Sequence, residues 1–144
     1  MGEPVQVGSL IYTVLDAEWH DQLGEPPNVR TPQQRFLSIR ISVTNSGVAT
    51  SGIPALSLVD SRGKTYEELN EGEGVEEWLG FLREVKAAQT ERGRILFDAP
   101  TGPYHLRLVN DADPDNEKVA LVDIPVQLGP TVPQPAALPS PGQP

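Results

Sequence analysis

Residues 36–47 read FLSIRISVTNSG, and apolar and polar residues alternate strictly over residues 37–44. Successive side chains of an extended backbone leave on opposite faces, so a period of two predicts a strand with one buried face. The Asn-Ser-Gly that follows, residues 45–47, predicts a turn. We expect the buried face to hold Leu37, Ile39, Ile41 and Val43.

Shorter runs of the same kind recur along the chain, separated by segments rich in glycine, proline and aspartate. Gly8-Ser9 interrupts the first run and predicts a bulge or a switch between sheets. Gly63 predicts a positive φ in the turn 60–64. Pro125 places the last strand at a sheet edge. The spacing indicates an all-β, immunoglobulin-like antiparallel β-sandwich of roughly seven to nine strands. These further strands are expected near 5–14, 56–59, 65–66, 85–88, 93–97, 104–108 and 119–126.

The chain divides into three parts. Residues 1–4 form a flexible N-terminus and residues 5–128 the sandwich. Residues 129–144 contain six prolines and predict a polyproline-like tail or linker, which would tether the domain or serve as a rigid ligand. Within the sandwich, Val75, Trp78 and Leu82 fall at helical spacing, which predicts one short helix or turn near 75–83.

The amino-acid composition limits the classes of molecule that the protein is expected to bind. The 144 residues carry a formal charge of -9, and such a surface repels nucleic acid and anionic lipid. There is no cysteine, which excludes disulfides and thiolate metal sites. No apolar run is long enough to span a membrane, and Met1 to Pro4 show no signal peptide. Either the protein is cytoplasmic, or the sequence is a mature fragment with an added start. The oligomeric state is left open.

The order of motifs resembles a bacterial immunoglobulin-like family of unknown function. It comprises secreted proteins and lipoproteins related to a mycobacterial secreted immunogenic antigen. Its pattern is a strand ending in N-x-G, a D-x-x-G-x-x-Y hairpin and a G-x-x-x-F-x-x-P strand. The chain departs from it at 89–91, where Gln-Thr-Glu replaces a Pro-Gly turn, and it lacks the lipoprotein cysteine. The resemblance implies an extracellular or cell-envelope location. The matching residues are Asn45, Gly47, Asp60, Gly63, Tyr66, Gly93, Phe97 and Pro100.

An acidic loop is the strongest candidate for a metal site. Carboxylates at alternate positions can converge oxygens on Ca²⁺. The loop is not an EF-hand, because Asn116 and Val122 stand where glycine and glutamate are required. The interpretation we favour is a solvated hairpin loop. The candidate ligands are Asp111, Asp113, Asp115 and Glu117.

Two further features admit a functional reading. Six glutamates between 67 and 77 could attract a basic partner or a metal ion, although such runs are usually solvated faces. Trp78 and Phe81 could form an exposed patch for a protein or peptide partner. For Trp78 we favour burial in the core, and for Phe81 the choice stays open.

Catalysis has little support in the sequence. His20 and His105 are the only histidines, and either would serve as the general base of an enzyme, but no nucleophile-elbow, zinc or phosphate-loop motif is present. We therefore expect a non-catalytic extracellular or envelope binding module without a cofactor. A Ca²⁺-responsive structural or assembly protein is the alternative, and an unrecognised enzyme is the third hypothesis.

Overall fold

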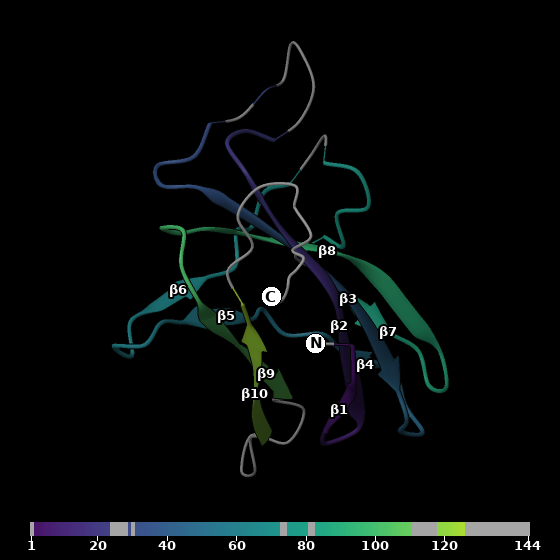
Figure 1. Ribbon diagram of the computed structural model, residues 1–144. Coiled ribbons are helices and arrows are strands. Elements are labelled where there is room, and N and C mark those ends of the chain that lie inside the picture. Colours follow the sequence, from purple (N-terminus) through teal and green to yellow (C-terminus); the bar gives the residue numbers. More distant parts are fainter. Residues whose placement is uncertain are drawn as a thin grey trace, which may run out of the picture.

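The protein is an antiparallel β-sandwich in the computed structural model, which describes residues 2–23, 29, 31–72, 75–80, 83–110 and 118–125. Two four-stranded sheets lie face to face, and a two-stranded ribbon lies beside them (Figure 1). The described strands are β1 (Pro4–Val7), β2 (Leu10–His20), β3 (Phe36–Asn45), β4 (Ser51–Gly52), β5 (Ser57–Val59), β6 (Thr65–Glu67), β7 (Glu84–Val85), β8 (Thr90–Asp98), β9 (Tyr104–Asn110) and β10 (Lys118–Ile124).

The strand order is that of an immunoglobulin-like Greek key. One sheet has the order β1-β2-β3-β8 and the other β10-β9-β5-β6, with β4-β7 as the ribbon. All pairings between the described strands are antiparallel. If β2, β3, β5, β8, β9 and β10 are taken as strands A, B, C, E, F and G of an immunoglobulin domain, the order matches that fold with strand D missing. The missing strand leaves the β8 edge to be covered by other means.

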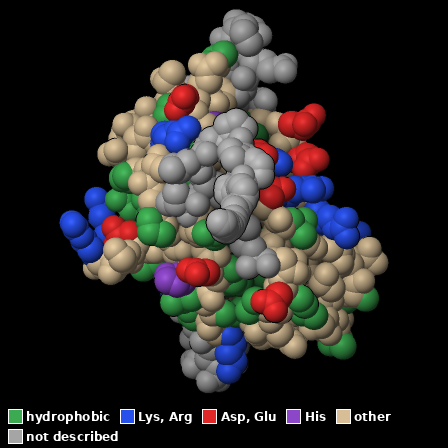
Figure 2. Space-filling view, in the orientation of Figure 1, with side chains coloured by type: hydrophobic (Ala, Val, Ile, Leu, Met, Phe, Trp, Pro, Cys, Tyr) green, Lys and Arg blue, Asp and Glu red, His purple; other side chains and the backbone are tan. Residues whose placement is uncertain are grey.

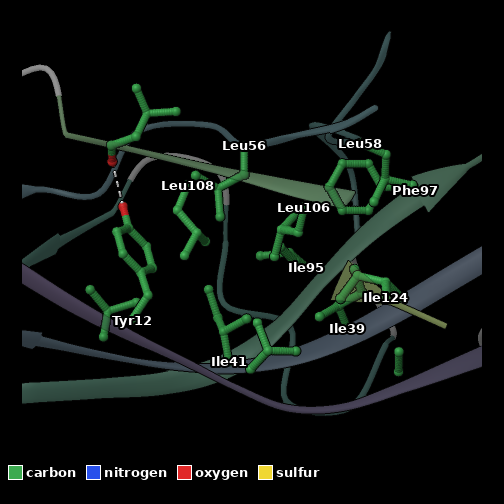
Figure 3. Close-up of a cluster of buried hydrophobic side chains, with 14 of the residues drawn as sticks. Tyr12, Ile39, Ile41, Leu56, Leu58, Ile95, Phe97, Leu106, Leu108 and Ile124 are labelled. Atoms are coloured by element: carbon green, nitrogen blue, oxygen red, sulfur yellow. Dashed lines mark hydrogen bonds between the residues drawn. The ribbon is translucent and has the colours of Figure 1, made fainter. Parts of the chain in front are cut away.

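The main core lies between the two sheets. Because apolar and polar residues alternate along residues 37–44 of β3, the apolar side chains of that stretch all lie on the face that is turned toward the opposite sheet. Leu37, Ile39, Ile41 and Val43 are each fully buried, as their spacing predicted. Ile39 and Ile41 point toward side chains of the opposite sheet, among them Leu58, Leu106 and Leu108 (Figure 3).

Each sheet has a tyrosine whose hydroxyl group bonds a backbone carbonyl outside its own strand. One bond connects the two sheets, and the other connects a sheet to a loop. The Tyr12 hydroxyl on β2 crosses the core and donates a hydrogen bond to the Val109 carbonyl, 2.7 Å away (Figure 3). The Tyr104 hydroxyl at the start of β9 donates to the Pro100 carbonyl four residues earlier, which is a tyrosine corner. Both hydroxyls thereby satisfy buried polar groups that would otherwise cost free energy.

Several sequence predictions need correction. Gly8-Ser9 is neither a bulge nor a sheet switch: it is the two-residue turn of a hairpin, with Val7 opposite Leu10. Near 85–88 the described strand is only Glu84–Val85. Residues 90–92 belong to β8 rather than to a turn. Ten strands are described, more than the predicted number, because two of them contain only two residues.

The helix-or-turn prediction for 75–83 resolves as a turn in the described residues 75–80. The Trp78 amide donates to the Val75 carbonyl, and the Val75 amide donates to Gly72. Glu77 has a positive φ of 65°, which an α-helix does not permit. No described segment forms a helix long and apolar enough to cross a bilayer.

Candidate binding site

A second, smaller hydrophobic cluster lies on the outer face of the β1-β2-β3-β8 sheet. We call it the outer cluster. The pairing of β3 with β8 makes Phe36 and Leu96 diagonal neighbours on that face, and Leu23 packs against them. Phe36 and Leu96 are 5% and 1% exposed although they face away from the main core. The half-buried side chains that complete the cluster are Leu69, Val75 and Trp78.

Residues 69–72 and 75–79, which we call the covering segment, bring those half-buried side chains into place, because they are hydrogen-bonded to the edge of β8. The Leu69 amide donates to the Leu96 carbonyl, at 2.8 Å, and the Leu79 amide donates to Arg94, at 2.9 Å. The Arg94 amide donates back to the Glu77 carbonyl. A Cβ on Gly93 would stand 2.7 Å from that carbonyl, so the close approach requires glycine. This irregular segment occupies the place of the missing strand D and satisfies an edge that would otherwise be open to pairing.

A hollow of about 510 Å³ opens over the outer cluster. That volume lies within the range of small-molecule sites. Its described walls are four apolar side chains, Leu23, Phe36, Leu69 and Leu96. Three polar residues, Thr31, Asn70 and Glu71, also belong to the described walls. An apolar floor with a few convergent polar groups is the usual composition of a ligand pocket.

A buried ion pair fixes the start of the covering segment. Glu68 is 5% exposed, and its carboxylate receives two hydrogen bonds from the Arg83 guanidinium, with Nη2 to Oε1 at 2.8 Å. Arg83 also donates to the carbonyls of Ile53, Pro54 and Gly80. All five guanidinium N–H groups are therefore used. Glu68 Oε1 further accepts a hydrogen bond from the Leu56 amide, so one ion pair joins three segments of the chain.

The outer face beside the hollow carries a network of partly buried charged side chains. Arg94 Nη1 lies 3.1 Å from an Asp16 carboxylate oxygen, and it also bonds Ser38 Oγ. Arg40 lies 3.2 Å from Glu77, at the end of the covering segment. Figure 2 shows acidic and basic side chains interspersed with hydrophobic ones on the face turned to the viewer.

Trp78 packs against the outer cluster rather than in the main core. Its indole also lies directly on Gly72, where an added Cβ would come within 2.4 Å of the ring. The Nε1 atom is shielded from solvent, and in the described structure it has no hydrogen-bond partner. The second member of the predicted aromatic pair, Phe81, lies outside the described residues.

The predicted calcium ligands Asp111, Asp113, Asp115 and Glu117 also lie outside the described residues, so that hypothesis stays a prediction. Within the described ranges, no group of three or more His, Asp or Glu side chains is arranged to hold a metal ion. His20 lies 3.4 Å from Glu18, and His105 lies 3.2 Å from Asp123. Neither histidine lines the hollow over the outer cluster.

The glutamate run is not a uniform solvated face. Glu67, Glu71, Glu76 and Glu77 are exposed, as the favoured interpretation had it, but Glu68 is buried in its pair with Arg83. Glu73 lies outside the described residues. The sequence alone gave no sign of which glutamate would turn inward, because the arginine that neutralises it stands fifteen positions later.

The first two motifs of the family pattern have structural roles. Asn45 is fully buried, and its side chain bonds the carbonyls of Ala49 and Val85 and the amide of Gly47. Asp60 accepts hydrogen bonds from the amides of Arg62 and Lys64, and thereby closes the β5–β6 turn. Gly63 has the predicted positive φ, at 85°.

Tyr66 of the second motif and the three residues of the third motif also have structural roles. Tyr66 packs edge-on against Tyr104, with ring centroids 5.8 Å apart. Gly93 admits the covering segment, Phe97 is fully buried in the core, and Pro100 accepts the Tyr104 hydroxyl. Burial raises the pKa of Tyr104 to about 12, and the charges of Tyr66 and Asp60 add to the effect. The motifs therefore specify the sandwich and leave the hollow unassigned.

Sequence reasoning missed the hollow because its walls come from four separate segments. The available signals were weak: Phe36 and Leu96 are apolar residues on the strand faces expected to be polar. An apolar residue at a strand position that should meet solvent indicates that something covers that face.

Comparison with solved structures supports the fold. The yjhA protein of Bacillus subtilis aligns with a TM-score of 0.64 at 15% identity, over 86% of this chain and 97% of that one. A β-sandwich protein of Clostridium difficile, described as uncharacterized, aligns at 0.54 and 14% identity, over 84% and 90%. A candidate lipoprotein of B. subtilis, ycdA, aligns at 0.66 and 13% identity, over 85% of this chain but only 38% of its own length. At these identities the likeness shows the fold alone.

No curated protein matches the sequence. A family model does, over residues 1–120, which is most of the chain. This match and the bacterial neighbours bear out the resemblance to a bacterial family of unknown function, and they do not show the link to the mycobacterial antigen. The chain belongs to the family described as a domain of unknown function, DUF4352.

Proposed function

We propose that this domain is a non-catalytic binding module that acts at the cell envelope or outside the cell. The observation that carries the proposal is the hollow over the outer cluster. It is lined by four apolar and three polar residues, and it holds no histidine among its described walls. A pocket of this composition suits recognition of a ligand better than acid–base chemistry.

The way the domain uses its buried polar groups supports the same function. Asn45, Glu68 and Asn110 are buried, and each bonds backbone groups of distant segments. Such side chains hold the sandwich together and are not presented to a substrate. What the fold presents to a partner is therefore the surface around the hollow.

The proposed location draws on the neighbours. One solved structure of similar fold is described as a candidate lipoprotein. The order of motifs also suggests a relationship to a mycobacterial secreted antigen. Such a relationship would fit a module that is exported from the cell. Fractionation of cells that express the gene with its native upstream sequence tests the location. Recovery in the envelope or medium is expected, and recovery only in the cytoplasm would contradict that part.

Binding is tested with octanol, an uncharged probe whose chain fits an apolar pocket. Titration of the ¹⁵N-labelled domain should shift the backbone amide signals of Phe36, Leu69 and Leu96 together and saturably, with millimolar affinity. The amide of Leu58, enclosed in the main core, serves as the internal control and should not move. The absence of any saturable shift at the three lining residues would overturn the proposed site.

A further inference from the structure

We infer that the hollow over the outer cluster takes a small amphipathic molecule with an apolar body and a cationic polar end. The inference rests on the proposed binding function and adds the chemical class of the ligand. It depends on the distribution of charge around an otherwise apolar pocket.

The apolar floor of the hollow indicates that the ligand has an apolar body. Phe36 and Leu96 are almost completely buried, and Leu69 stands beside them on the covering segment. These side chains provide no hydrogen-bonding group, so an alkyl chain or ring gains by displacing water from them.

The negative charge at the rim of the hollow indicates that the polar end of the ligand is cationic. Glu71 is exposed and is the one charged residue among the described walls of the hollow. No described cation opposes it there: Arg35, beside Phe36, bonds Asp21, and Arg94, two residues before Leu96, bonds Asp16. The guanidinium groups nearest in sequence to the floor are thus engaged with other acids.

The remaining polar groups of the rim are compatible with an ammonium group. Thr31 and Asn70 each offer an oxygen that can accept a hydrogen bond from such a donor. The chain as a whole carries a formal charge of -9, which adds a field that favours cations over anions. The same Glu71 carboxylate disfavours a carboxylate ligand.

The test compares octylamine, octanol and octanoate, which share one apolar chain and differ in the charge of the polar end. Dissociation constants come from the shifts of the Phe36, Leu69 and Leu96 amides. We expect octylamine to bind the hollow most tightly and octanoate most weakly. One carboxylate a few ångströms from the ligand charge, in a solvated site, gives a difference of about tenfold between them.

Glu71→Gln is the decisive variant, because it removes the charge and keeps the size of the side chain. It should bring octylamine and octanoate to within about threefold of each other and leave octanol unchanged. Glu91→Gln, in a separate hollow next to Glu84 and Lys86, is the matched control and should keep the wild-type order. Both variants are exposed and should fold normally.

The outcomes separate the two proposals. If octanol and octylamine both fail to shift the lining residues, the proposed binding site falls, and this inference falls with it. If octanol binds there and octanoate binds as tightly as octylamine, the site stands and the inference is overturned. A charge preference that survives Glu71→Gln also overturns it.

Discussion

The domain has two hydrophobic clusters on the two faces of one sheet, and they differ in how they are closed. The main core is enclosed by a second sheet, and its central residues, such as Ile39 and Ile95, have no exposed surface. The outer cluster is covered by an irregular segment that touches the β8 edge through a few hydrogen bonds. Full closure by regular strands leaves no room for a ligand, whereas partial closure leaves a hollow of about 510 Å³.

The contrast separates the part of the fold that contributes most to stability from the part that is left open to a ligand. A closed core contributes stability in proportion to the apolar area it removes from water. An incompletely closed cluster leaves part of that area available to a ligand. The ion pair of Glu68 with Arg83 lies where the two regions meet. It fixes the start of the covering segment to the sandwich.

Breaking that ion pair should have the largest effect. Glu68→Ala leaves the buried Arg83 guanidinium without its counter-charge, and we expect a loss of about 3–5 kcal/mol in the free energy of unfolding, measured by urea denaturation. Hydrogen exchange at the Leu69 and Leu79 amides should accelerate as well, because the covering segment is released. Glu67→Gln, at the exposed neighbour, is the control and should change stability by less than about 0.5 kcal/mol. A loss below about 1 kcal/mol for Glu68→Ala would contradict the role of the pair.

A pair of adjacent residues on β8 tests the two clusters directly. Ile95 faces the main core and Leu96 faces the outer cluster, and both are almost completely buried. Ile95→Ala should lose about 3–4 kcal/mol, because it leaves an enclosed cavity. Leu96→Ala should lose about 2 kcal/mol, because it widens a hollow that water already reaches. Equal losses in thermal or urea unfolding would show that the outer cluster is closed as tightly as the core.

The tyrosine corner should contribute less. Tyr104→Phe keeps the ring and removes the hydrogen bond to Pro100, so a loss of about 1 kcal/mol is expected. Tyr66→Phe, in the ring that packs against it, leaves that hydrogen bond in place and serves as the control. A loss as large for Tyr66→Phe would argue against the hydroxyl of Tyr104 as the cause.

Tyr104 also gives a pH dependence. Its pKa in the folded protein is raised from 10.0 to about 12, so the folded state holds the phenol proton more tightly than the unfolded state. The corresponding stability is complete below pH 10 and is lost as the pH rises toward about 12. Unfolding measured over this window should show a steeper loss in the wild type than in Tyr104→Phe. Parallel curves would contradict the assignment.

Breaking the partly buried charge network beside the hollow should have the smallest effect on stability. Arg94→Gln removes the contact with Asp16, and we expect a loss below about 1 kcal/mol that shrinks further at high salt. Urea unfolding at low and high ionic strength measures both effects. A loss that does not depend on salt would mean that packing of the arginine stem, rather than its charge, is responsible.

Much of the sandwich was accessible from the sequence. The period of two in β3 predicted its buried face residue by residue, since a pleated strand has only two faces. Pro125 predicted an edge position for the last strand, and β10 is indeed the outer strand of its sheet. These predictions hold because each depends on the geometry of a few consecutive residues.

Only the tertiary structure decided which polar residues are buried and where a hollow forms. Glu68 looks like its exposed neighbours until the fold brings Arg83 to it, and Phe36 and Leu96 become neighbours only through the pairing of β3 with β8. The local pattern of a chain fixes the two faces of each strand. What covers an outer face depends on contacts between segments far apart in sequence, and no local pattern records them.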